Sequence, residues 1–279
     1  MDRRYYSLRT GKNQDGLKLD LDGLKALFLS EFQRLDALHY FQEYFGYFCV
    51  DDGRVAGKRG TDIAARLSFD LRKHDLWPIS QAIEEYSEED LFDVIEYLFD
   101  NVSKPLEGRY HSYGNCGMHY STFDRDTGRS EYRAALNKLL ETYGDGFELS
   151  EIGEILELAP QGMQEIFAAD VPSPDPNVAE RVASAIEKFR RYKATADERR
   201  GAVRDLADVL EYLRPQAKHV LATADEKDLF NIANNFAIRH HNAAQKNDYD
   251  KNIWLSWMFY FYLSTIHACI RLIDKADGS

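Results

Sequence analysis

A short polar stretch near the C-terminus combines the residue types that acid–base chemistry on a phosphate requires. It consists of Arg239, His240, His241 and Asn242, and a polar link and a long apolar segment follow it. A guanidinium is permanently charged and binds a phosphate through two hydrogen bonds, while a histidine titrates near neutral pH and can transfer a proton. These four residues are the candidate catalytic group for metal-independent RNA cleavage. The structural alternative is a helix C-terminus, whose carbonyl groups cationic side chains also satisfy.

A second candidate group lies in residues 106–128, which are rich in glycine, aromatic and hydroxyl residues and show no helical periodicity. Its candidate functional residues are Arg109, His111 and His119, with Cys116 between the two histidines. Their spacing matches no standard zinc pattern and a fourth ligand is missing, so we expect neither a metal nor a cofactor. The aromatic residues and Arg109 can instead stack on bases. Alternatively, the segment is a glycine-containing hairpin whose side chains pack on the domain.

A third candidate group is a cluster of basic residues that is expected to contact RNA phosphates. It consists of Lys188, Arg190, Arg191, Lys193, Arg199 and Arg200. Clustered cations are typical of a surface that follows a nucleic-acid backbone. Acidic residues are interspersed among them, and an ordinary solvated helix face gives the same pattern.

Charge is unevenly distributed, and this limits the partners of each part of the chain. The 279 residues carry a net charge of −12. Residues 178–279 contain 16 Lys and Arg against 14 Asp and Glu, whereas residues 1–177 contain 19 against 33. The acidic N-terminal part argues against nonspecific nucleic-acid binding there. Walker, GxGxxG, HExxH and GxSxG motifs are absent from the sequence, so nucleotide hydrolysis, dehydrogenase, zincin and hydrolase-elbow chemistry have no support.

Cysteine usage and hydropathy indicate a cytoplasmic protein. Cys49, Cys116 and Cys269 are far apart in the sequence, and the N-terminus lacks an apolar signal region. The apolar run 253–273 is about long enough to span a membrane. It contains serine, threonine, histidine and arginine, which are costly in a bilayer. We therefore predict a buried core helix and no membrane association.

Apolar periodicity and capping residues predict the elements that position these groups. Helices are expected over 21–45, from the cap Thr61 to residue 73, over 87–101 with a Ser87 capping box, and over 131–143. Hairpins are expected within 106–128 and around Glu151 to Gly153. Prolines in 159–177 mark a boundary. Beyond it, helices are expected over 177–193, 198–213 with a break near Pro215, 225–241 and from about residue 250.

Two parts of the sequence resemble known families. The turn IRHHN before a long aromatic helix, in an all-helical region, resembles the HEPN superfamily. RRYYSLRTG, YSEEDLFDVIEYLFDNVSKP and GFELSEIGEILEL resemble the N-terminal domain of AbiJ-type abortive-infection proteins. The resemblance implies a mainly α protein. An N-terminal α+β domain with small hairpins would occupy residues 1–171, and a HEPN-like four-helix bundle residues 177–279.

The resemblance also implies a function. Catalytic HEPN proteins are metal-independent ribonucleases, usually dimeric, with a motif of Arg, a polar residue and then His four to six positions after the polar residue. Arg239 and His240 match the first two positions, but Ala244, Gln245 and Lys246 stand where the histidine is expected. We therefore expect an RNA-targeting effector of bacterial anti-phage defence that acts as a homodimer through its C-terminal bundle. The alternatives are a non-catalytic HEPN-like module that binds RNA or protein and a purely structural dimer.

Overall fold

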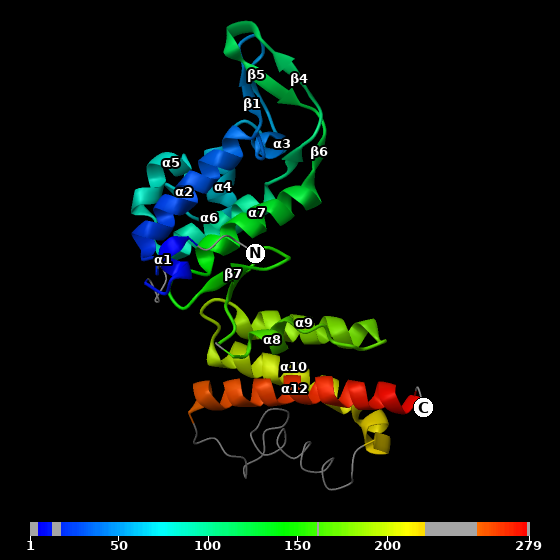
Figure 1. The fold of residues 1–279 in the computed structure, drawn as a ribbon. Helices are drawn as coiled ribbons and strands as arrows, with labels where there is room; N and C mark the ends of the chain where they lie inside the picture. Colours follow the sequence, from blue (N-terminus) through cyan, green and yellow to red (C-terminus); the bar gives the residue numbers. More distant parts are fainter. Residues whose placement is uncertain (1–4, 13–17, 161, 221–249, 278–279) are drawn as a thin grey trace. The chain divides into compact units, whose positions relative to one another are not determined.

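The chain is mainly α-helical, as the sequence predicts, and it forms two compact units. The computed structural model describes residues 5–12, 18–160, 162–220 and 250–277. Unit 1 spans Met1–Leu158 and unit 2 spans Ala159–Ser279. Figure 1 shows the helices and short strands of unit 1 and the long helices of unit 2.

Unit 1 is built mainly from helices, and the one over Glu88–Asp100 is largely buried. Its helices are α1 (Tyr6–Arg9), α2 (Leu21–Ala37), α3 (Gln42–Phe45), α4 (Ile63–Leu71), α5 (Ile79–Ala82), α6 (Glu88–Asp100) and α7 (Arg125–Leu140), with 3-10 turns η1 (Ile83–Glu85) and η2 (Tyr113–Asn115). Helix α6 begins with the predicted capping box between Ser87 and Asp90, which confirms that prediction. The hydroxyl of Tyr132 in α7 donates to the carbonyl of Ile95 in α6 at 3.0 Å, so these helices form one core.

Three helix boundaries differ from the predicted ones for local reasons. The helix predicted over 21–45 ends at Ala37, and His39 adopts a positive φ before α3 begins. The cap of α4 is Asp62 rather than Thr61, because the Asp62 side chain accepts the N–H of Ala65. Helix α7 begins at Arg125, six residues before the predicted start, because Asp124 caps it through Thr127.

Four antiparallel two-stranded sheets complete the described part of unit 1, and the β3–β6 pair encloses the β4–β5 hairpin. The pairs are β1 (Tyr47–Cys49) with β2 (Gly53–Val55), β3 (Lys104–Pro105) with β6 (Phe123–Asp124), β4 (Gly108–His111) with β5 (Gly117–Tyr120), and β7 (Phe147–Leu149) with β8 (Ile155–Glu157). The hairpins predicted within 106–128 and around 151–153 are therefore confirmed. The β1–β2 hairpin was not predicted, because Asp51, Asp52 and Gly53 indicate only a break in the sequence.

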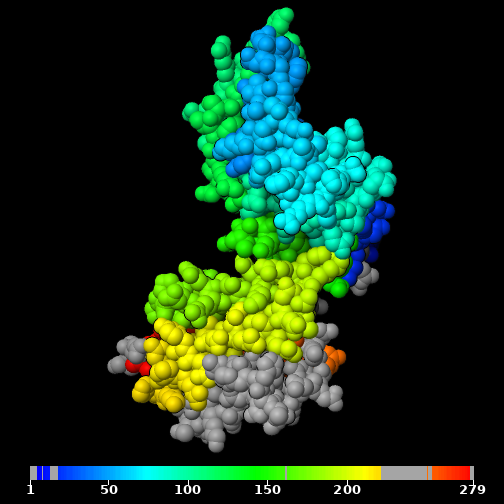
Figure 2. Space-filling view, turned by 180° about the vertical axis from the view of Figure 1, so that it is seen from behind, coloured from blue at the N-terminus to red at the C-terminus, as the bar shows by residue number. Residues whose placement is uncertain are grey.

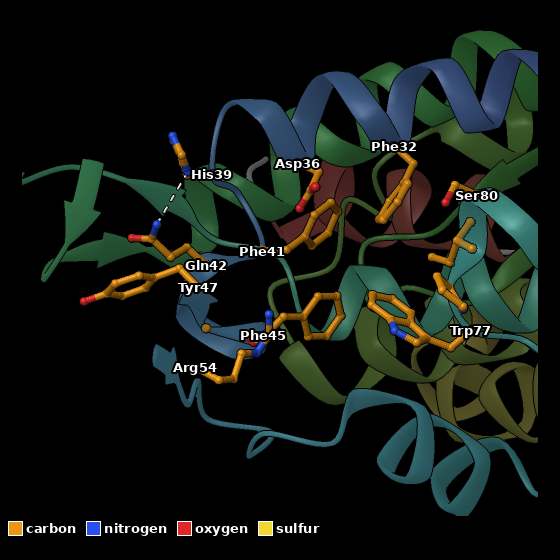
Figure 3. Close-up of a pocket in the computed structure, with 13 residues that line it drawn as sticks. Phe32, Asp36, His39, Phe41, Gln42, Phe45, Tyr47, Arg54, Trp77 and Ser80 are labelled. Atoms are coloured by element: carbon orange, nitrogen blue, oxygen red, sulfur yellow. Dashed lines mark hydrogen bonds between the residues drawn. The ribbon is translucent and has the colours of Figure 1, made fainter. Parts of the chain in front are cut away.

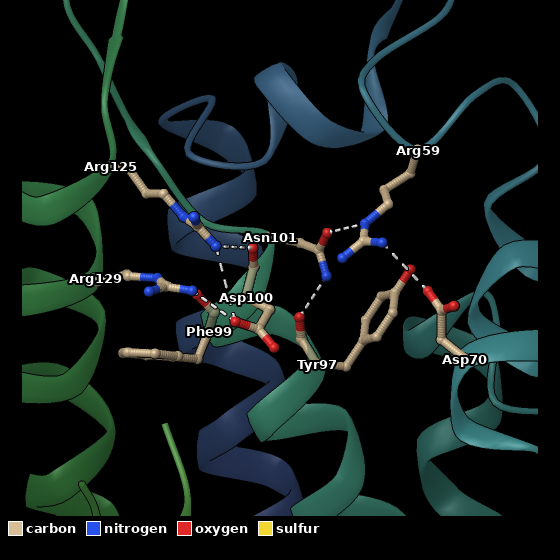
Figure 4. A network of polar contacts seen from close by, with 8 residues as sticks. All are labelled: Arg59, Asp70, Tyr97, Phe99, Asp100, Asn101, Arg125 and Arg129. Carbon is tan, nitrogen blue, oxygen red and sulfur yellow. Dashed lines mark hydrogen bonds and ion pairs between the residues drawn. The ribbon is translucent and has the colours of Figure 1, made fainter. Parts of the chain in front are cut away.

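A network of polar contacts anchors the segment after β2 to the end of α6 (Figure 4). Arg59 donates through Nε to the Oδ1 of buried Asn101 and forms an ion pair with Asp70 at 3.4 Å. Arg129 of α7 donates to Asp100 at 2.6 Å. Because Asn101 is fully buried, its amide requires such partners. Through Arg59, the network holds the chain that follows the β1–β2 hairpin against α4 and the end of α6.

Unit 2 contains α8 (Gln164–Ala168), α9 (Pro176–Arg190), α10 (Ala196–Val220) and α12 (Lys251–Asp277). Its start differs from the predicted boundary at 171–177, because Phe167 packs against Phe259 of α12 with ring centroids 5.7 Å apart. Ala159 and Phe167 therefore belong to the core of unit 2. Helix α10 continues through Pro215, where the sequence predicts a break. The helix predicted over 225–241 lies outside the described residues.

Helix α12 is the central helix of the described part of unit 2. Leu255, Phe259, Leu263 and Ile266 are fully buried in the core that α12 shares with α9 and α10. Within the described residues, Ile253–Ala276 is the one helix long and apolar enough to cross a membrane, and half of its most apolar window is buried. A helix in the core of a folded domain is expected to be buried in this way.

Candidate metal centre

The fold brings four potential metal ligands together in unit 1. Three of them lie in strands and one in a turn: Cys49 ends β1, His111 ends β4, His119 lies in β5, and Cys116 follows η2. One ligand atom of each side chain lies within 4.8 Å of those of the other three. The Sγ atom of Cys49 is 3.7 Å from Nδ1 of His111. The Sγ atom of Cys116 is 3.1 Å from Nε2 of His119. Thiolates and imidazoles are the ligand types that transition metals prefer.

The β4–β5 turn places three of the four ligands. Its residues Gly114, Asn115 and Gly117 all have positive φ, which glycine and asparagine adopt at the lowest cost. The register pairs Arg109 with His119 and His111 with Gly117. Since neighbouring residues of a strand point to opposite faces, His111 and His119 project from one face of the hairpin.

A glutamine of helix α3 fixes the hairpin to the helical core. The side-chain amide of Gln42 donates to the carbonyl of Met118 at 3.0 Å and accepts the N–H of Tyr120 at 2.6 Å. It thereby bonds β5 on both sides of His119. The ring of His119 also packs on Tyr47 of β1, with centroids 4.2 Å apart. Contacts from two elements therefore orient this imidazole.

Two further contacts connect the β4–β5 hairpin to β1 and to the turn that follows it. The Nε2 atom of His111 is 3.2 Å from Oδ2 of Asp51, and the Cys116 thiol donates to the carbonyl of Phe48 at 3.6 Å. Backbone hydrogen bonds from Asp52 act to lower the pKa of the Cys49 thiol, but burial and the adjacent Cys116 thiol contribute to a net rise of that pKa. The thiol is thus protonated at neutral pH when no cation is bound.

Only part of this cluster follows from the sequence. His111, Cys116 and His119 lie within one predicted hairpin, but their spacing indicates no fourth ligand. The structure supplies Cys49, which is 62 residues before His111, so the expectation that a fourth ligand is missing is wrong. Arg109, the other predicted residue of this segment, is exposed and does not belong to the cluster.

A cavity lies beside the cluster in unit 1 (Figure 3). It has a volume of about 420 Å³, and its wall includes the aromatic rings of Phe45 and Trp77 and the polar side chains of Asp36 and His39. Tyr47 also lines it and packs on His119, so one side chain of the cavity wall contacts the cluster.

The predicted basic cluster gathers at the turn between α9 and α10. Lys188 forms an ion pair with Asp205 at 3.0 Å, and Arg200 forms one with Asp197 at 3.4 Å. The guanidinium of Arg190 lies over the ring of Phe167 at 5.6 Å, and that of Arg199 lies over Phe189 at 5.5 Å. Several cations thus also contribute to packing.

Two cations of this cluster, Arg191 and Lys193, are exposed on the turn itself. Lys193 also has a positive φ, which places it at a sharp change of chain direction. The predicted catalytic group, Arg239, His240, His241 and Asn242, lies outside the described residues.

Comparison with known proteins gives no match: no family model, curated protein or solved structure is similar to this chain. The resemblance to HEPN and AbiJ-type proteins therefore stays a prediction.

Proposed function

We propose that this chain is an RNA-targeting effector of the HEPN type, acting in bacterial anti-phage defence, whose helical unit contacts RNA through the basic turn between α9 and α10. We define the basic turn as residues 190–200. The HEPN type and the role in anti-phage defence rest on the resemblance. One observation supports RNA contact: these eleven consecutive residues contain five cations and two acidic residues, whereas the whole chain is acidic, and they form the turn between α9 and α10. Clustered cations release counterions from a phosphate backbone, which favours RNA binding.

The two acidic residues of the basic turn reduce its positive charge only in part. Glu198 is engaged with Thr195, whose backbone N–H and hydroxyl both donate to its carboxylate at 2.8 and 2.7 Å. Its function there is to cap α10. Asp197 is paired with Arg200. Arg191 and Lys193 are the exposed cations of the basic turn, so we expect these side chains to contact phosphates.

Catalysis is the second part of the proposal and rests on the resemblance. Arg239 would bind the scissile phosphate, and His240 or His241 would transfer the proton. The protein would act as a cytoplasmic homodimer through its helical unit. The alternative is a non-catalytic HEPN-like module, which the exposed cations of the basic turn support equally, because binding requires only the positive charge.

The test of RNA binding uses the two exposed cations of the basic turn. Arg191→Gln/Lys193→Gln removes two exposed charges, and Lys218→Gln/Lys275→Gln is the matched control, since both lysines are exposed on other parts of unit 2. Fluorescence anisotropy with labelled single-stranded RNA over a salt series gives the slope of log affinity against log salt. The slope is negative. We expect the first variant to reduce its magnitude by about 1.4, or 0.7 for each cation, and the control to leave it unchanged. Equal slopes in all three proteins would exclude the basic turn as the RNA surface.

Cleavage is measured separately with labelled tRNA and mRNA in the presence of EDTA. Arg239→Ala and His240→Ala/His241→Ala are expected to abolish cleavage without changing the thermal unfolding of the protein. Absence of cleavage by the wild-type protein, together with RNA binding, would establish the non-catalytic alternative. A loss of thermal stability in Arg239→Ala would instead indicate that this residue caps its helix.

A further inference from the structure

We propose that Cys49, His111, Cys116 and His119 bind one Zn²⁺ ion, and that this ion holds the β1–β2 and β4–β5 hairpins together as a structural site. The proposal concerns unit 1 and goes beyond the proposed function, which rests on the basic turn of unit 2.

The distances within the cluster are close to those of a tetrahedral zinc site. Zinc binds cysteine sulfur at about 2.3 Å and histidine nitrogen at about 2.0–2.1 Å, so neighbouring ligand atoms of a tetrahedral site are about 3.3–3.8 Å apart. The distance from Cys49 Sγ to His111 Nδ1 is 3.7 Å, and that from Cys116 Sγ to His119 Nε2 is 3.1 Å. Small shifts of the side chains would complete the coordination, because all four ligand atoms already lie within 4.8 Å of one another.

The surrounding lobe lacks a hydrophobic core that could hold it together. We define the hairpin lobe as residues 46–62 and 104–127, all of which the structure describes. Cys49 is its one buried residue. Large apolar side chains of the lobe are exposed instead, among them Phe48, Tyr110 and Tyr113 at 63%, 61% and 70%. Figure 2 shows the β1–β2 and β4–β5 segments side by side at one end of unit 1. Small lobes of this kind are commonly held by a structural metal.

The outer contacts of the cluster also suit a metal. Nδ1 of His111 faces Cys49, while Nε2 faces the carboxylate of Asp51 at 3.2 Å. A proton on Nε2 is donated to Asp51 and leaves the lone pair of Nδ1 directed at the ion. Histidine ligands of zinc usually have such a partner on the second nitrogen, which fixes the tautomer and the ring orientation.

The ligand set identifies the ion and its role. Two thiolates and two imidazoles form a common structural zinc site, whereas magnesium and calcium prefer oxygen ligands. Four protein ligands leave no coordination position for water or substrate, as in structural rather than catalytic sites. The ion connects β1 to the β4–β5 hairpin, two segments about sixty residues apart in the sequence. Its role is to fix this long-range contact.

Metal content is the first test. The full-length protein is purified without chelator, and zinc is measured by inductively coupled plasma mass spectrometry. We expect one zinc per chain in the wild-type protein and none in Cys49→Ser or His119→Gln. The matched controls are Cys269→Ser, a buried cysteine of unit 2, and His74→Gln, an exposed histidine outside the cluster; both are expected to retain zinc. A wild-type protein that contains no zinc and binds none when zinc is added would overturn the proposal.

Cobalt substitution and a variant outside the ligand set keep the test independent of folding. Co²⁺ bound to the wild-type protein is expected to show the visible absorption of a tetrahedral ion and a thiolate charge-transfer band. Asp51→Ala leaves all four ligands in place and is expected to weaken zinc binding about 10- to 100-fold in competition with a chelating indicator. Unchanged zinc affinity in Asp51→Ala would contradict the proposed role of Asp51 in orienting His111. A disulfide between Cys49 and Cys116 in protein from cells alkylated before lysis would overturn the zinc assignment.

Discussion

The Nε2 atom of His111 lies 3.2 Å from the Oδ2 atom of Asp51, while Nδ1 of the same ring faces the thiol of Cys49. The imidazole therefore lies between a carboxylate from the β1–β2 turn and a sulfur from β1. Asp51 and Cys49 belong to a hairpin that contributes one buried residue to the lobe. The geometry of this small hairpin consequently depends on polar and metal contacts rather than on burial.

Removal of zinc is expected to loosen the hairpin lobe and leave unit 2 unchanged. A chelator removes the ion that joins β1 to β4 and β5, and the lobe has no hydrophobic core to replace it. Hydrogen–deuterium exchange should become faster at the amides of β4 and β5 and stay the same in α10. Cys49→Ser is the control, because its exchange should be fast with or without chelator. Unchanged exchange in a zinc-containing wild-type protein after complete zinc removal would show that the ion has no structural role.

Gln42 is expected to stabilise unit 1 by connecting α3 to β5. Its amide bonds the backbone of both Met118 and Tyr120, and its side chain is largely buried. Gln42→Ala leaves these backbone groups without their partner, so we expect the free energy of unfolding to fall by about 1–3 kcal/mol. Urea unfolding measures it. Gln33→Ala, at an exposed position of α2, is the control and should change the free energy by less than about 0.5 kcal/mol. Equal effects of the two substitutions would contradict a special role for Gln42.

The buried His267 predicts that unit 2 loses stability in mild acid. Burial and the nearby charge of Arg271 lower the pKa of this imidazole below its usual value. The unfolded chain therefore binds a proton more readily than the folded one, and the stability from the neutral imidazole is lost as pH falls below about 6.5 and through the lowered pKa of the folded state. Urea unfolding of the wild-type protein between pH 7.5 and 5.5 measures this loss.

His267→Gln is the variant that assigns this pH dependence to one residue. A glutamine does not titrate, so the variant is expected to unfold with a flatter pH dependence over the same range, whatever its stability at pH 7.5. The exposed His219 of α10 provides the control, because His219→Gln leaves the buried imidazole in place. If His267→Gln and the wild-type protein lose stability in parallel, the acid sensitivity has another origin.

Local sequence signals predict the elements of this protein better than its site. The capping box of α6 and the glycines of the β4–β5 turn act within a few residues, so Ser87, Asp90 and Gly114 indicate their elements directly. Cys49 could not be assigned to the cluster, because only the folded chain brings β1 beside β5. The helix boundary that the sequence predicts near Pro215 is wrong for a related reason. Leu213 and Ala217 pack in the core and keep α10 helical through the proline.

The zinc site also changes how ribonuclease activity has to be measured. A metal-independent nuclease is tested in EDTA, but EDTA would also remove zinc from the hairpin lobe. We expect the wild-type protein to cleave RNA in EDTA, because the proposed catalytic residues Arg239 and His240 need no metal. Cys49→Ser, which lacks the zinc site permanently, is expected to cleave at the same rate with and without EDTA. If EDTA abolishes cleavage by the wild-type protein and Cys49→Ser is inactive in both conditions, the zinc-bound lobe is required for activity. If EDTA abolishes cleavage by both proteins while Cys49→Ser is active without it, the reaction itself uses a metal.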